Sequence, residues 1–181
     1  MKNILYTAIC ACSILCGAQA QTPGSEVKAI VGGRGDKTAS KTLNRATDTT
    51  RQPGSTFKIL AAYSAALDAG GLTLASVQDD APYTYAGANG KSVNNYDRRY
   101  RGFTTLREAI TDSINIVTVK TLAQAGVSLG WQYVQEYGFT TVDSRDMNEA
   151  LALGGITQGV SNLELTAAYA ATIPLGFVKS L

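Results

Sequence analysis

Ser55 and Lys58, three residues apart, form the pair in this 181-residue chain whose residue types and spacing best suit covalent chemistry. From Ser55 onward, apolar residues recur every three or four positions, which predicts a helix with both side chains on one face, within hydrogen-bonding reach of each other. The field of a helix N-terminus, together with desolvation, lowers the pKa of such a lysine. Its neutral amine can then take the proton of the serine and activate it as a nucleophile.

The rest of the composition narrows the chemistry further. The chain has no histidine, which excludes Ser-His-Asp and Cys-His arrangements and histidine metal sites. Its three cysteines all lie within the first sixteen residues, so the remainder can form neither a disulfide nor a thiolate metal site. With 45% hydrophobic residues, 17% charged residues and a net charge of +2, the chain is typical of one globular domain without a dense basic patch. We therefore expect no cofactor, no metal and no nucleic-acid partner.

Two Ser-x-Asn pairs offer a second hydroxyl to the site. Ser92 and Asn94 lie within residues 79–102, a glycine- and tyrosine-rich segment predicted as a long loop that is either a solvated arm or the wall of a ligand groove. Ser113 and Asn115 lie in a short break between two predicted helices, which is a stiffer mount for a catalytic hydroxyl. We therefore select Ser113 and Asn115, and the alternative is that they only cap the neighbouring helices.

Helices are the main elements predicted to position these residues. The helix from Ser55 ends at a glycine pair, and apolar spacing predicts further helices over residues 116–125 and 131–137. Two capping boxes begin two others, at Thr105-x-x-Glu108 and Ser161-x-x-Glu164.

Residues 27–33 are rich in valine and isoleucine and predict a strand. A second Ser-x-x-Lys pair, Ser25 and Lys28, falls in this strand-like sequence. Residues three apart in a strand point to opposite faces, so this pair cannot act as the first one can.

The first twenty residues have the pattern of a secretory signal peptide. Lys2 precedes an apolar run to about Cys16, and Ala18-Gln19-Ala20 resembles a cleavage site. The run is shorter than the roughly 20 apolar residues of a good membrane span. The predicted domain therefore covers residues 21–181, outside the cytoplasm, in the periplasm or at the outer face of the cytoplasmic membrane.

The segment around Ser55 resembles a known nucleophile motif. Asn44-Arg45-Ala46 with Arg51-Gln52-Pro53-Gly54-Ser55-Thr56-Phe57-Lys58 is similar to that of class A high-molecular-weight penicillin-binding proteins. Segment 27–34 resembles the first strand of their transpeptidase domain, segment 105–115 its second motif and segment 151–171 a later helix region, so the resemblance covers about residues 24–171. It implies an α/β (α+β) fold like that of the serine β-lactamases and transpeptidases, with the helical subdomain largely present.

The resemblance also implies the role of each residue. Ser55 attacks the penultimate D-alanine carbonyl of a peptidoglycan stem peptide ending in D-Ala-D-Ala, and releases the last D-alanine. Lys58 is the base, Ser113 relays a proton to the leaving amine, and Asn115 binds the acyl-chain amide and orients Lys58. β-Lactam antibiotics would acylate the same serine.

The family's third motif, Lys-Thr-Gly, does not occur in the chain, and residues 172–181 no longer resemble the family. We therefore expect a truncated domain whose antiparallel sheet is incomplete at the C-terminus, so that strand 27–33 lacks partners. Because a single oxyanion-hole donor is worth on the order of 10²–10³ in rate, activity is expected to suffer or to be lost.

Three other functions are weighed against a transpeptidase. One is a sensor or binding module that takes β-lactam or cell-wall peptide without turnover. A β-lactamase is disfavoured, because no Glu-x-x-Leu-Asn segment is present to position a deacylating water. The third is a non-catalytic helical fragment that packs on another protein through exposed apolar faces.

Overall fold

A computed structural model describes residues 27–34, 39, 41–86 and 90–172. The chain divides into two compact units, residues 1–30 and 31–181, and the second contains every helix and strand described below. The predicted signal peptide and Ser25 lie outside the described residues. No helix within the described ranges is both long enough and apolar enough to cross a membrane.

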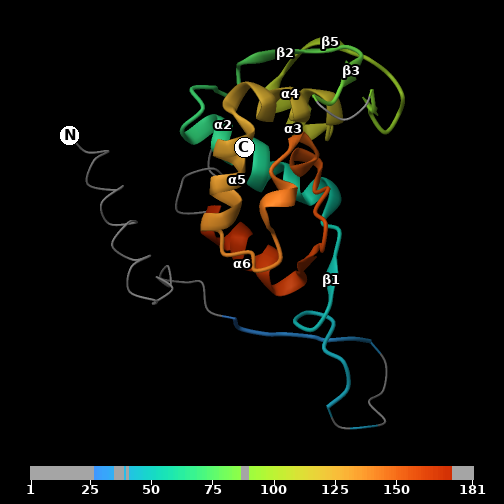
Figure 1. The fold of residues 1–181 in the computed structure, drawn as a ribbon, viewed down its shortest axis with the longest axis vertical. Helices are drawn as coiled ribbons and strands as arrows, with labels where there is room; N and C mark the ends of the chain where they lie inside the picture. The colour runs from blue at the N-terminus through green and yellow to red at the C-terminus, as the bar shows by residue number, and fades with distance from the viewer. Residues whose placement is uncertain (1–26, 35–38, 40, 87–89, 173–181) are drawn as a thin grey trace, which may run out of the picture. The chain divides into compact units, whose positions relative to one another are not determined.

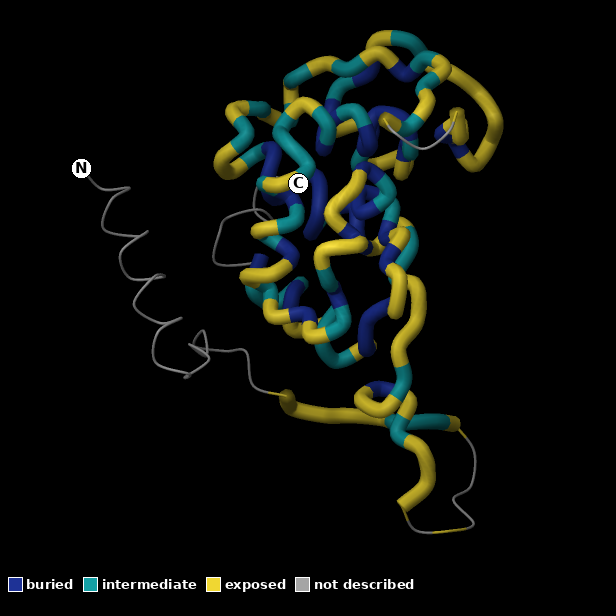
Figure 2. Tube along the Cα trace, viewed as in Figure 1, coloured by how far each residue is buried: buried dark blue, intermediate teal, exposed yellow. Residues whose placement is uncertain are grey.

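The predicted helix at Ser55 is present, but it changes its winding along its length. It begins as the 3₁₀ turn η1 (Gly54–Thr56), continues as the π-helix η2 (Ile59–Tyr63) and ends as α2 (Ser64–Asp68), just before the glycine pair. At the change from η2 to α2 the Ser64 hydroxyl donates to the carbonyl of Ile59 at 2.8 Å, five residues back. This helix is the most buried part of the fold (Figure 2).

Four α-helices follow and pack around this buried helix (Figure 1): α3 (Leu106–Thr111), α4 (Asn115–Ala125), α5 (Val127–Glu136) and α6 (Asn162–Thr172). The predicted capping box of Thr105 and Glu108 begins α3, and that of Ser161 and Glu164 begins α6. Two shorter 3₁₀ turns, η3 (Ser144–Asp146) and η4 (Glu149–Leu153), connect α5 to the last strand.

One glycine explains how closely α5 approaches the buried helix. A Cβ atom at Gly130 would lie 2.4 Å from the carbonyl oxygen of Ala61 and 2.3 Å from the side chain of Leu122. Only a residue without a side chain allows this approach, so the glycine at position 130 sets the spacing between α5 and the buried helix.

The described strands are short and pair two by two, all antiparallel. β1 (Thr50–Arg51) pairs with β6 (Val160–Ser161), β2 (Val77–Asp80) with β5 (Gly102–Thr105), and β3 (Tyr83–Thr84) with β4 (Ser92–Val93). The prediction of one long loop over residues 79–102 is therefore wrong in part, since two strand pairs organise it. Runs of two residues carry too little alternation to be recognised in a sequence.

The predicted strand at residues 27–33 is also wrong, because none of residues 27–34 belongs to a strand. Val27, Ile30 and Val31 are exposed there. A valine-rich composition favours extended backbone, but a strand exists only through the ladder of hydrogen bonds to a neighbour.

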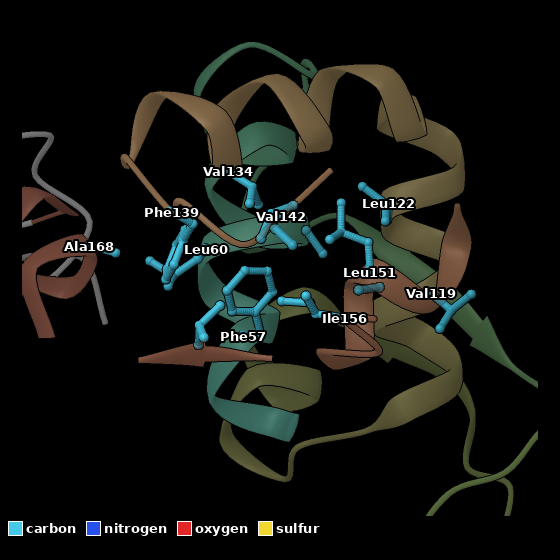
Figure 3. Packing of buried hydrophobic residues seen from close by; sticks show 14 of the residues in the cluster. Phe57, Leu60, Val119, Leu122, Val134, Phe139, Val142, Leu151, Ile156 and Ala168 are labelled. Carbon is cyan, nitrogen blue, oxygen red and sulfur yellow. The ribbon is translucent and has the colours of Figure 1, made fainter. Parts of the chain in front are cut away.

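The main hydrophobic core joins the buried helix to the elements that surround it (Figure 3). Phe57 is fully buried in it, and its ring lies 5.2 Å from that of Phe139 in a tilted arrangement. A second, smaller cluster contains Tyr63 and Leu106. Because Phe57 directly precedes Lys58 in the chain, packing of this core fixes the backbone that carries the lysine.

Candidate active site

The Lys58 amine is the centre of the candidate site. Its side chain is buried, and Nζ makes three contacts: to the carbonyl oxygen of Ser113 at 2.6 Å, to Ser113 Oγ at 2.9 Å and to Asn115 Oδ1 at 2.6 Å. The structure therefore brings together three of the four predicted site residues, from segments more than fifty positions apart in the sequence.

These contacts suit both protonation states of the lysine. As an ammonium group, Lys58 has three N–H donors and each contact is an acceptor. As a neutral amine it keeps two donors for the Ser113 carbonyl and Asn115 Oδ1, and its lone pair can accept the hydroxyl proton of Ser113. The same geometry thus permits a proton to pass between Lys58 and Ser113.

Burial lowers the pKa of Lys58 to about 8, from the ordinary value of 10.5. Water is withheld from the amine, and the charged form loses more from this than the neutral form does. No carboxylate in the described part of the chain forms an ion pair with Lys58. Such an ion pair would favour the charged form of the lysine. About a tenth of Lys58 is therefore neutral at pH 7.

Ser113 presents two of its atoms to the lysine because of its backbone conformation. It lies between α3 and α4 with φ of +53°, in the left-handed region that side-chain-bearing residues rarely adopt. This conformation costs on the order of 1–3 kcal/mol and is typical of functional sites. It turns both the carbonyl and the hydroxyl of one residue toward Nζ.

Ser55 lies in η1, exposed, one turn before Lys58. Lys58 lies beyond the end of this 3₁₀ turn, in the helix that continues from it. The Ser55 hydroxyl makes no hydrogen bond to any residue that the structure describes, and the Lys58 amine is engaged with Ser113 and Asn115 instead. The Ser55–Lys58 hydrogen bond expected from the spacing is therefore not formed here, although catalytic hydrogen bonds often tighten only when substrate binds.

The turn that carries Ser55 is held from the other side by the segment after η4. The Gln52 side chain bonds the backbone of Ile156, accepting from its N–H at 3.1 Å and donating to its carbonyl. A Cβ atom on Gly154, whose φ is +72°, would lie 2.6 Å from the backbone of Gly54. Gly154 therefore permits the close approach of this segment to the turn that carries Ser55.

Asn115 is the first residue of α4, and the 79–102 segment holds it in place. Its side-chain amide donates to the carbonyl of Asn94 at 2.8 Å, and its backbone N–H donates to Asn95 Oδ1 at 3.0 Å. The unselected Ser-x-Asn copy thus contributes a backbone carbonyl rather than a catalytic hydroxyl. Sequence reasoning missed Asn95; the only available signal was an asparagine pair ahead of a charged turn.

The described residues contain no group of three or more Asp, Glu, Cys or His side chains that could hold a metal ion.

Comparison with known proteins identifies the family. The model of the penicillin binding protein transpeptidase domain matches residues 17–176. The chain therefore belongs to the penicillin-binding protein transpeptidase family, as its nucleophile motif indicates. Penicillin-binding protein 1A of Neisseria meningitidis is 40% identical over 147 residues, which cover 79% of this chain and 18% of that protein.

Solved structures agree with this assignment. Penicillin-binding protein 1A from Haemophilus influenzae matches with a TM-score of 0.63 and 34% identity, over 71% of this chain and 19% of that one. Penicillin-binding protein A from M. tuberculosis, in an imipenem acyl-enzyme complex, is 23% identical and shares the fold, with a TM-score of 0.60 over 71% of this chain and 34% of that one. The described fold is thus a partial transpeptidase fold of helices and short strands, and the chain spans less than a fifth of the length of these penicillin-binding protein 1A relatives.

Proposed function

We propose that the chain carries the acylation site of a D,D-transpeptidase that cross-links peptidoglycan stem peptides, with Ser55 as nucleophile and Lys58 as base. The observation that carries this proposal is the buried Lys58 amine, whose pKa is lowered to about 8 and whose contacts are Ser113 and Asn115. Structural lysines are usually exposed and charged. A buried lysine without a carboxylate partner in the described residues is better suited to proton transfer.

The acylation step would proceed as follows. The neutral Lys58 amine takes the Ser55 hydroxyl proton as Oγ attacks the carbonyl carbon of the penultimate D-alanine. The carbon–nitrogen bond then breaks, and the leaving amine of the last D-alanine takes a proton that Ser113 relays from Lys58. The acyl group stays on Ser55 as an ester, and Asn115 binds the acyl-chain amide while it keeps Lys58 oriented.

An amine from a neighbouring stem peptide would then attack the ester and form the cross-link. Water in its place would make the same site a carboxypeptidase. A β-lactam would acylate Ser55 by ring opening, as the M. tuberculosis relative named above carries imipenem in its acyl-enzyme complex. The peptidoglycan substrate implies a location outside the cytoplasm, in the periplasm or at the outer face of the cytoplasmic membrane.

Labelling by a fluorescent penicillin tests the proposal. We expect the purified chain to acquire a covalent label that resists denaturation, and Ser55→Ala to lose it while its circular dichroism spectrum is unchanged. Ser92→Ala is the matched control, since Ser92 is the hydroxyl of the other Ser-x-Asn copy, and it should label like the parent. Equal labelling of the parent and Ser55→Ala would refute the assignment of the nucleophile.

A binding or sensor module is the second candidate, favoured by one observation. In the structure Ser55 is not hydrogen-bonded to its base, so the site could accept an acyl group slowly and fail to transfer it. A stable penicillin label without release of D-alanine from a D-Ala-D-Ala peptide would support this alternative. Release of D-alanine that depends on Ser55 would exclude it.

A further inference from the structure

Asn95 is a buried side chain that links the 79–102 segment to the site. Its amide nitrogen donates to both carboxylate oxygens of Asp80, at 2.8 and 3.0 Å, and to the carbonyl of Arg99 at 2.8 Å. Asn95 is only 4% exposed and Asp80 is fully buried. Because a carboxylate can only accept, Asp80 fixes which end of the Asn95 amide faces it and directs the other end elsewhere.

The oxygen of that amide faces the beginning of helix α4. It accepts the backbone N–H groups of Asn115 at 3.0 Å and Ile116 at 3.2 Å. The residue that precedes the helix, Ile114, has no side-chain acceptor of its own. Asn95 therefore does from a distant part of the chain what a capping residue ordinarily does, and satisfies two free donors of the first turn.

This cap lies directly behind the lysine site. Asn115, whose N–H the cap holds, is the residue whose Oδ1 contacts Lys58 Nζ at 2.6 Å. The neighbour of Asn95, Asn94, accepts the side-chain amide of Asn115 at 2.8 Å through its backbone carbonyl. Two consecutive residues thus fix both the backbone and the side chain of the asparagine that contacts the base.

The Asp80 carboxylate is itself fixed in place. It accepts the backbone N–H of Arg101 at 2.9 Å, and the guanidinium of the same residue lies 3.8 Å away. This guanidinium also bonds Asp97 at 2.9 Å and lies 3.9 Å from Asp112. The buried charge therefore has a partner, and the chain of contacts from Asp80 to Lys58 has no missing hydrogen bond.

We propose that Asn95, held by Asp80, is a positioning residue that sets Asn115 and, through it, the environment of Lys58. The kinetic part of this proposal rests on the proposed function, whereas the geometric part does not. The two parts can therefore fail separately.

The geometric test is a titration of Lys58 by NMR in the full chain, with hydrogen exchange of the two capped amides. In the parent we expect slow exchange at Asn115 and Ile116. In Asn95→Ala we expect faster exchange there and a Lys58 pKa that rises toward the free-lysine value, because water reaches the amine once Asn115 is released. Tyr96→Ala is the matched control, since Tyr96 is the next residue and 99% exposed, and it should titrate like the parent.

The kinetic test is the rate of acylation by fluorescent penicillin. A displacement of about 1 Å at a catalytic site can cost about 10²-fold in rate, so we expect Asn95→Ala to be acylated about 10- to 100-fold more slowly than Tyr96→Ala. Asn95→Asp should also be slow, because it sets two carboxylates against each other. The exchanged pair Asp80→Asn with Asn95→Asp restores a donor facing an acceptor between these two positions, but it loses the donor to the Arg99 carbonyl, so it should be acylated faster than Asn95→Asp alone and more slowly than the parent.

The outcomes separate cleanly. A parent chain that penicillin does not label refutes the proposed function but leaves the titration and exchange tests valid. A folded Asn95→Ala with the parental Lys58 pKa overturns the positioning proposal, whatever its rate. Should Asn95→Ala not fold, fast exchange of the Asn115 and Ile116 amides in the parent would overturn it without any variant.

Discussion

The pH dependence of acylation is the prediction that follows most directly from the burial of Lys58. In the proposed mechanism the neutral amine is the active form, so the rate is expected to rise with pH until the lysine is fully deprotonated. With a pKa of about 8, about a tenth of Lys58 is neutral at pH 7, against about 0.03% for a lysine at 10.5, a gain of about 300-fold. Between pH 6 and pH 8 the neutral fraction rises from about 1% to about one half, so the acylation rate should rise about 50-fold.

The assay is the pseudo-first-order rate of labelling by fluorescent penicillin between pH 6 and pH 9, with spontaneous hydrolysis of the reagent subtracted. Lys58→Arg places a cation at this position that stays protonated over the whole pH range. Its labelling rate should be about 10²–10⁴-fold lower than that of the parent, and the rate should no longer rise with pH. Lys91→Arg makes the same change at an exposed lysine and should follow the parent curve. A parent rate that is flat from pH 6 to pH 8, or that falls, would refute the role of Lys58 as base.

Two further predictions concern the frame around the site. Gly154→Ala should lower the free energy of unfolding by about 1–3 kcal/mol more than Gly71→Ala does. Both glycines have φ of +72°, but only at Gly154 would an added Cβ atom meet the backbone of Gly54. Urea unfolding of the two variants measures the difference, and equal losses of stability would contradict the prediction. Tyr63→Phe should lower the free energy of unfolding by about 1 kcal/mol. The Tyr63 hydroxyl contacts the buried Thr118 hydroxyl at 2.8 Å, and the substitution removes this donor. An unchanged urea midpoint would show that the hydrogen bond contributes nothing to stability.

Much of the helical architecture could be predicted from the sequence. Apolar spacing and capping boxes are local signals, and both predicted boxes form at Thr105 and Ser161. The selection of Ser113 over Ser92 also rested on a local property, the short break between two helices. In the structure Ser113 contacts Lys58 and Ser92 does not.

The parts that sequence reasoning missed depend on partners far away in the chain. Residues 27–33 have the composition of a strand, yet a strand needs a neighbour that composition cannot supply. The role of Asn95 follows from contacts with Asp80 and Asn115, fifteen and twenty positions away. Likewise, the direction of the Lys58 amine is set by Ser113 across the fold rather than by the helix that carries it.

Mass spectrometry of the penicillin-treated chain tests the central claim most directly, because it locates the acyl group as well as detecting it. Ring opening has no leaving group, so we expect the intact mass to rise by one whole penicillin molecule. After trypsin, the added mass should lie on the peptide of residues 52–58, between Arg51 and Lys58. An unmodified chain, or an adduct on any other peptide, would contradict the assignment of Ser55 and Lys58 as the acylating pair.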